Sequence, residues 1–203
     1  MTTNLPTVQK YLEQLPLGID SHPECQAKAS VLRNALASRS LVDVLDALPA
    51  PVRELVVDPP PVSTWVREVH ALVAMLAIRD VHFPLGAHGL AEYEAWTHRR
   101  NRELLTRPLY RALFLVLSPD RLIDGMQKRW GHFRRGTSIE LLERERGRAK
   151  VRIRFPTRLY EETVLAGLRG ALRAALEAAG AHEIEIETEH AGVRDARYSL
   201  AWR

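Results

Sequence analysis

The sequence contains few of the residues and motifs on which common functional sites depend. Cys25 is the only cysteine of the 203 residues, which excludes an internal disulfide and any zinc or iron–sulfur site built from several cysteines of this chain. The longest apolar stretch, 69–78, is interrupted by His70, whereas a membrane-spanning helix needs roughly 20 apolar residues. Residues 1–12 lack a basic region followed by an apolar run. We therefore expect no signal peptide, no insertion into a membrane and a cytoplasmic location.

Catalytic and metal-binding motifs are equally scarce. The sequence contains no Gly-x-Ser-x-Gly pattern and no glycine-rich phosphate loop. His88 and Glu92 are four residues apart and could share a helical face, as could Glu94 and His98, but no third ligand follows at a defined spacing. We therefore predict surface or capping roles for these pairs, no catalytic residue, no metal site and no cofactor.

The formal net charge of +4 conceals an uneven distribution along the chain. Residues 1–96 carry a net charge of −4, residues 97–158 carry +11, and residues 159–203 carry −3. A basic middle between two acidic ends is the main electrostatic feature of the sequence. A basic segment of this kind is also found in proteins that bind nucleic acids.

Apolar residues recur at helical spacing through much of the first 117 residues. One apolar stripe predicts a buried helix that Ser63 caps. The three prolines at 59–61 predict a stiff extended connector before it, because proline cannot donate a backbone hydrogen bond. The stripe consists of Val66, Val69, Leu72, Val73 and Leu76, and the helices expected in this part span 8–14, 23–37, 41–48 (capped by Ser40), 63–79, 88–105 and 108–117.

The hydrophobic period changes after Gly136. Val151, Ile153 and Phe155 alternate with arginines, which is typical of a strand with one buried face. We therefore predict an α+β fold in which a helical part, 1–117, packs on an α-β-β-α-β-β unit, 118–203, with a four-stranded antiparallel sheet, together forming one integrated domain. The elements expected in the unit are a helix from Ser118 to Phe133, strands at 137–145 and 150–155, a helix at 161–179 that Gly180 ends, and two last strands near 184–187 and 198–202.

The helix expected at 161–179 has two apolar faces. One face is a stripe of leucines suited to a sheet, and the other consists of small residues that would let another helix approach closely. We expect the N-terminal helices, or a second subunit in a homodimer, to pack on the small face. The leucines are Leu165, Leu168, Leu172 and Leu176, and the small residues are Gly167, Gly170, Ala171, Ala174 and Ala178.

Segment 104–121, from Leu-Leu-Thr to Leu-Ser-Pro-Asp-Arg, and the closing Tyr-Ser-Leu-Ala-Trp at 198–202 carry a family resemblance. They resemble a paralogous family of unknown function that is abundant in myxobacteria, and the likeness covers most of the chain. More remotely, the α-β-β-α-β-β half resembles the ligand-binding fold shared by haem–nitric-oxide sensors, 4-vinyl-reductase-type domains and TRAPP trafficking subunits. This likeness implies a pocket between helices and sheet that serves sensing or protein contacts.

The chain departs from these folds in two respects. The cysteines that some vinyl-reductase-type domains carry around their last strands are missing from 189–198. No histidine of this chain matches a haem-ligand motif. The resemblance therefore implies neither a metal nor haem for this chain.

The first functional hypothesis is a non-enzymatic cytosolic sensor or protein-interaction module that binds a small apolar ligand or a partner protein. Large aromatic and apolar side chains line such sites. The same side chains could equally serve simple core packing. The candidate pocket residues are Trp65, His70, Tyr110, Phe114, Trp130 and Phe133.

Two alternatives belong to other classes. A nucleic-acid-binding protein would use the basic region 97–158 to hold phosphates beside aromatic side chains, although Arg152 and Arg154 could instead pair with the glutamate row at 183–187. An enzyme would need a cleft in which His70, His82 or His98 lies beside a carboxylate. The arginines proposed for the nucleic-acid alternative are Arg99, Arg100, Arg129, Arg134 and Arg135.

Overall fold

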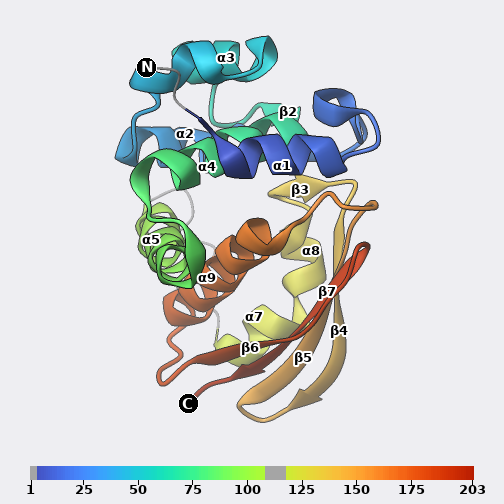
Figure 1. The fold of residues 1–203 in the computed structure, drawn as a ribbon. Coiled ribbons are helices and arrows are strands. Elements are labelled where there is room, and N and C mark those ends of the chain that lie inside the picture. Colours follow the sequence, from blue (N-terminus) through green and yellow to red (C-terminus); the bar gives the residue numbers. More distant parts are fainter. Residues whose placement is uncertain (1–3, 108–117) are drawn as a thin grey trace.

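The computed structural model describes residues 4–107 and 118–203, in which a group of N-terminal helices lies above a sheet with one long helix against it (Figure 1). Within these residues, no helix combines the length and the apolar character that crossing a membrane requires. The helices are α1 (Pro6–Gln14), α2 (Ala29–Ser38), α3 (Ala50–Val57), α4 (Glu68–His82), α5 (Gly86–Thr106), α7 (Pro119–Asp124), α8 (Met126–Trp130) and α9 (Glu162–Ala178), with 3-10 turns at Gly18–Asp20 and Val42–Ala47.

The predicted four-stranded antiparallel sheet is present in the C-terminal half. Its strands are β4 (Ser138–Glu145), β5 (Arg148–Arg154), β6 (Glu185–Ala191) and β7 (Asp195–Ala201), in the order β4-β5-β7-β6. Helix α9 lies across one face of this sheet (Figure 1). The α+β class and the α-β-β-α-β-β order are therefore confirmed. The periodicity predicted them well because β5 and α9 each bury one continuous apolar face.

A second, smaller sheet was not predicted. It consists of β1 (Gln26–Lys28), β2 (Trp65–Arg67) and β3 (Arg134–Arg135), in the order β2-β1-β3. The expected helix at 23–37 therefore begins only at Ala29, and the helix expected from Ser63 begins only at Glu68. Strands of two or three residues are too short to leave an alternating pattern in the sequence. Through β3, this sheet ties the N-terminal part to the C-terminal unit.

The expected helix from Ser118 to Phe133 is also divided. Ser118 caps α7 as predicted, since its hydroxyl accepts from the backbone N–H of Arg121 at 3.3 Å. Gly125 then separates α7 from α8, which ends at Trp130 before β3 begins. Of the remaining expected helices, 41–48 is a 3-10 helix, and 108–117 lies outside the described residues.

Helices α5 and α9 lie in direct backbone contact. A Cβ atom added at Gly170 of α9 would lie 2.7 Å from the carbonyl oxygen of Glu94 and 2.9 Å from the backbone nitrogen of His98, both in α5. The small-residue face of α9 is therefore covered by an N-terminal helix, which confirms the first of the two expectations for it. Around Gly170 this face is occupied by α5 of the same chain, and the expected homodimer stays a prediction.

A buried ion pair joins α4 to β3. Glu68, at the start of α4, is fully buried, and its Oε1 accepts a hydrogen bond from the Tyr160 hydroxyl at 2.6 Å and pairs with the Arg134 guanidinium. The guanidinium also lies 5.5 Å from the ring centroids of Tyr160 and Trp130. A buried carboxylate is tolerated only with such partners, so this contact fixes how the N-terminal helices sit on the C-terminal unit.

We predict opposite effects for two alanine substitutions on α9. Gly170→Ala should destabilise the protein by about 1–3 kcal/mol, because its methyl group meets the α5 backbone. Gly167→Ala places its methyl group no closer than 3.5 Å to any neighbour, and it should raise stability by up to ~1 kcal/mol through helix propensity. Urea unfolding followed by circular dichroism measures both. Equal effects of the two substitutions would contradict the close contact.

We predict that Glu68→Met costs about 3 kcal/mol of stability, because it leaves the Arg134 guanidinium without its carboxylate. The double variant Glu68→Met with Arg134→Leu should recover most of this loss, since apolar side chains replace buried ion pairs at little cost. Urea unfolding of the two single variants and the double variant gives the coupling free energy. Strictly additive losses would show that the pair does not hold the two parts together.

Candidate functional site

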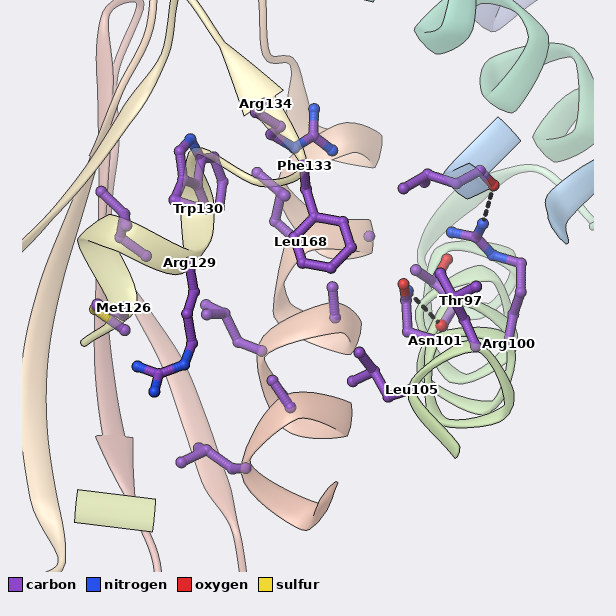
Figure 2. A pocket seen from close by; sticks show the side chains of 18 of the residues that line it. Thr97, Arg100, Asn101, Leu105, Met126, Arg129, Trp130, Phe133, Arg134 and Leu168 are labelled. Carbon is purple, nitrogen blue, oxygen red and sulfur yellow. Dashed lines mark hydrogen bonds between the residues drawn. The ribbon is translucent and has the colours of Figure 1, made fainter. Parts of the chain in front are cut away.

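A cavity of about 200 Å³ lies between α5, α9 and the segment formed by α7 and α8 (Figure 2). An engineered cavity of about 150 Å³ is already large enough to bind benzene, so this space suits a small organic molecule. Its walls are mostly the side chains of leucine, isoleucine, valine and methionine. The cavity is the best-formed candidate for a binding site in the described part of the chain.

Helix α9 forms the longest wall of the cavity. Leu168 and Leu172 of its leucine stripe line the space, together with the small residues Gly167, Ala171 and Ala175. Gly170, on a neighbouring part of the helix surface, contacts the α5 backbone, whereas these three residues face the cavity. The cavity therefore lies along one side of the α5–α9 contact.

The opposite wall comes from α8 and the residues that follow it. Met126, Trp130 and Phe133 line the cavity there, and Figure 2 shows Phe133 between Leu168 and α5. The Trp130 indole nitrogen donates a hydrogen bond to the Thr137 hydroxyl at 3.0 Å. This bond fixes the ring against the sheet, so the wall is held in place by its own polar anchor.

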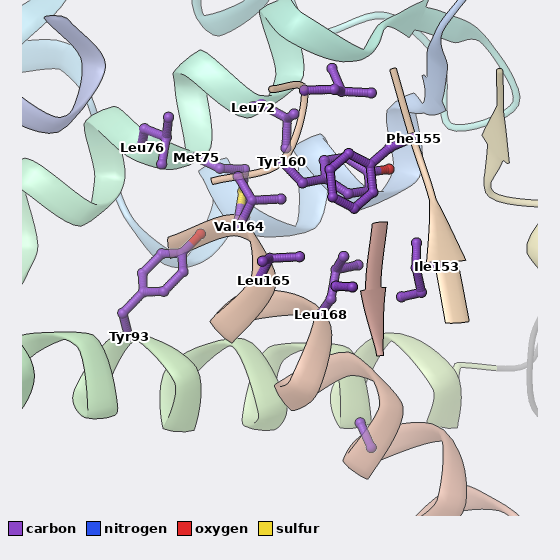
Figure 3. Close-up of a cluster of buried hydrophobic side chains, with 14 of the residues drawn as sticks. Leu72, Met75, Leu76, Tyr93, Ile153, Phe155, Tyr160, Val164, Leu165 and Leu168 are labelled. Atoms are coloured by element: carbon purple, nitrogen blue, oxygen red, sulfur yellow. The ribbon is translucent and has the colours of Figure 1, made fainter. Parts of the chain in front are cut away.

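Towards α4 the cavity ends at the main core. Leu72 and Met75 of α4 and Val164 and Leu168 of α9 line the cavity, and Figure 3 shows the same side chains gathered with those of the sheet. Most of the buried apolar residues of both parts form a single cluster. The cavity is therefore a gap at the edge of a continuous core.

The polar groups of the cavity are concentrated on α5. Asn101 is satisfied, because its side-chain nitrogen donates to the Thr97 carbonyl at 2.8 Å. Arg100 donates from Nη1 to the Val31 carbonyl of α2 at 2.7 Å. The Arg100 Nε and the Thr97 Oγ1 are buried and have no hydrogen-bond partner. Two unpartnered polar atoms one helical turn apart distinguish this wall from the others.

Arg100 is a buried cation without a carboxylate. Its exposed fraction is 3%, and it forms no ion pair among the described residues. Residues 1–3 and 108–117 contain no aspartate or glutamate, so the rest of the chain supplies no acidic partner either. Burial lowers the pKa of Arg100 to about 10, which leaves it protonated at neutral pH. The Trp96 ring, with its centroid 5.1 Å from Cζ, gives partial compensation.

The backbone around Arg100 is held by a bridge to α2. Asn34 of α2 is buried, and its side-chain nitrogen donates to the Arg100 carbonyl at 2.9 Å. Arg107, just after α5, donates in turn to the Asn34 side-chain oxygen at 3.1 Å. Together with the bond from Arg100 to Val31, this network fixes the buried guanidinium relative to both helices.

Only part of the predicted pocket coincides with this cavity. Trp130 and Phe133 line it, whereas Trp65 and His70 do not, and Tyr110 and Phe114 lie outside the described residues. Trp65 lies on β2 between the Lys28 ammonium and the Arg135 guanidinium, each 4.1 Å from its ring centroid. His70 is buried on α4, where its pKa is lowered by burial. Trp65 and His70 therefore do not line this cavity, and their role in ligand binding stays a prediction.

The polar residues that α5 contributes to the cavity were not predicted from the sequence as pocket residues. Thr97, Arg100 and Asn101 all lie on α5, and of these only Arg100 was a predicted site residue, in the nucleic-acid alternative. A pattern was nevertheless present, because Arg100 follows Tyr93, Trp96 and Thr97 at helical spacing and so belongs to the buried face. The aromatic residues in that pattern indicate burial more strongly than the arginine indicates exposure.

The arginines of the nucleic-acid alternative do not share one environment. Arg99 and Arg135 are exposed, Arg129 is half-buried at the cavity, Arg100 is buried, and Arg134 is engaged with Glu68. On the sheet, Arg152 and Arg154 both pair with Glu140 of β4, at 2.6 and 2.9 Å. The expected pairing with the glutamate row at 183–187 is wrong, because β7 lies between β5 and β6.

The histidines of the enzymatic alternative lie apart from one another and from the cavity. His98 contacts Glu177 at 2.9 Å across α5 and α9, and His82 contacts the Ser40 carbonyl at 2.7 Å. His70 of α4 lies near Asp20 and Arg67. None of the three is among the described residues that line the cavity.

Comparisons with known proteins agree with this architecture. Residues 104–203 match the family model described as "Protein of unknown function (DUF2378)". No curated protein sequence matches the chain. The structure is similar to that of an Fe(II) unliganded H-NOX protein from K. algicida, with a TM-score of 0.54 and 8% sequence identity over 87% of this chain and 96% of that chain.

A point mutant of the same H-NOX protein gives a TM-score of 0.51, with 9% identity over the same shares of the two chains. At this level of identity the likeness concerns the fold alone. Both resemblances drawn from the sequence are thereby confirmed: residues 104–203 carry the pattern of a protein family of unknown function, DUF2378, on a chain whose fold is similar to that of H-NOX proteins.

Proposed function

We propose that this protein is a ligand-binding sensor that holds a small apolar molecule in the cavity between α5, α8 and α9. The cavity itself carries the proposal, because apolar walls with a few convergent polar groups are typical of small-molecule sites. The fold shared with H-NOX proteins supports the same conclusion. The family match gives no information on the ligand, because the function of the family is unknown.

The residues around the cavity favour binding over chemistry. The described lining residues include no histidine, cysteine, aspartate or glutamate. General acid–base and nucleophilic catalysis draw on these groups most often. Tyr93 is the one phenol among the described lining residues, and burial raises its pKa, so it stays protonated. A bound molecule would therefore be held and released unchanged.

The fold also implies haem as a candidate ligand, and the described residues of the cavity do not fit it. Haem iron is held in proteins by histidine, cysteine thiolate, tyrosine phenolate, or methionine with histidine. The described cavity walls supply no histidine or cysteine, and 108–117 contain neither. The raised pKa of Tyr93 opposes the phenolate form. An organic ligand without a metal is therefore the better match.

The position of the cavity supports a role in sensing. Its walls come from α2, α4 and α5 of the N-terminal part and from α8, α9, β4 and β7 of the C-terminal unit. Arg134 lines the cavity and also pairs with Glu68 of α4. A ligand that fills the cavity would therefore change the packing between the N-terminal helices and the C-terminal unit. This change in packing is the means by which ligand binding could alter contact with a partner protein.

We predict that the protein binds an uncharged apolar dye, such as a phenyl-naphthylamine, and that octanol displaces it. Ala171→Phe should weaken dye binding about tenfold or more, because its ring occupies space that Ala171 leaves open in the cavity wall. Dye fluorescence in a titration measures the affinity.

Ala95→Phe is the matched control, since Ala95 is exposed on α5 and does not line the cavity. It should leave dye affinity unchanged, and circular dichroism should show both variants folded. Absence of dye binding to the unmodified protein, or equal affinities for both variants, would show that this cavity is not the binding site.

A further inference from the structure

We propose that the ligand of this cavity is a small carboxylic acid, whose carboxylate is bound by Arg100 and Thr97 while its apolar chain lies along α9. This inference rests on the proposed function and adds the chemical class of the ligand. It starts from two buried atoms of α5, Arg100 Nε and Thr97 Oγ1, which border the cavity and have no partner in the protein.

The first reason for a carboxylate ligand is the free-energy cost of burying the unpaired charge of Arg100. A buried charge is tolerated in proteins when it is paired, and an unpaired one costs several kcal/mol. Neither the described carboxylates nor the undescribed residues give Arg100 an acidic partner. A negative group on the ligand would supply the missing charge beside a guanidinium that is itself buried.

The second reason is the orientation of the Arg100 guanidinium. Nη1 is already used by the Val31 carbonyl at 2.7 Å. Nε is left without a partner, and a carboxylate is suited to accept its hydrogen bond, because arginine and carboxylate form strong charge-assisted hydrogen bonds. Figure 2 shows the guanidinium of Arg100 above Thr97, on the α5 side of the cavity. The Thr97 hydroxyl is therefore placed to donate to the same group.

The other two cavity arginines do not offer the same site. Arg134 is neutralised by Glu68. Arg129 is half-buried, and its Nη1 donates to the Arg121 carbonyl at 3.4 Å. Only Arg100 among the three combines burial of its side chain with the lack of a carboxylate and an unpartnered nitrogen. Arg129 is consequently a natural control for charge near the cavity.

The walls define the rest of the ligand. Beyond the α5 wall, the cavity is lined by Leu168 and Leu172 of α9 and by Phe133. These contacts suit an aliphatic or aromatic body rather than further polar groups. With about 200 Å³ of space, the site suits a medium-chain or small aromatic acid.

The test compares octanoate with octanol, which share one chain and differ in the carboxylate. Isothermal titration calorimetry should show octanoate binding about tenfold to a hundredfold more tightly, as expected for hydrogen bonds to a charged group. Arg100→Met should abolish this preference while octanol still binds, and Arg100→Lys should keep part of it. Arg129→Met and Arg99→Met should leave the preference intact.

Thr97→Val gives an independent readout that does not depend on the folding of Arg100→Met. It replaces the hydroxyl with a group of the same shape and should lower the preference for octanoate severalfold, in line with the loss of one hydrogen bond. If octanol binds and octanoate binds no more tightly, the carboxylate assignment is overturned and the apolar site stands. If Arg129→Met rather than Arg100→Met removes the preference, the assignment is also overturned. If neither molecule binds, both proposals fall.

Discussion

The backbones of α5 and α9 meet at Gly170, and the position of the cavity depends on this contact. Because Gly170 has no side chain, the Glu94 carbonyl and the His98 nitrogen can lie where a Cβ atom would otherwise be. On one side of the contact the helices are joined by polar pairs such as His98 with Glu177. On the other side Gly167 and Ala171 border the cavity, whose opposite wall comes from α8. A close helix contact thus creates the gap beside it.

Two arginines at the cavity, Arg134 and the buried Arg100, obtain their electrostatic partners in different ways. Arg134 is neutralised within the chain by Glu68, and the pair joins the N-terminal helices to the C-terminal unit. Arg100 has a backbone carbonyl and an aromatic ring as partners but no carboxylate. The first arrangement pairs opposite charges within the chain, whereas the second, under our proposal, gains its negative partner from a ligand in the cavity.

Much of the fold could be predicted from the sequence, and less of the site. The strands β4–β7 and helix α9 have clear periods, and the small face of α9 correctly indicated a neighbouring helix. The strands β1–β3 could not be predicted, since two or three residues show no period. Trp130 and Phe133 were found because aromatic residues are common in pockets. The role of Arg100 depends on which carboxylates lie near it in space, and sequence spacing does not contain that information.

The central claim is that Arg100 meets a ligand carboxylate inside the cavity, and a crystal structure of the protein grown with octanoate tests it most directly. The account predicts the carboxylate within about 2.7–3.2 Å of Arg100 Nε, with the chain against Leu168 and Leu172. It also predicts that Arg100 keeps its bond to the Val31 carbonyl. A structure with octanoate outside the cavity, or inside it with the carboxylate turned away from Arg100 towards Arg129, would contradict the account.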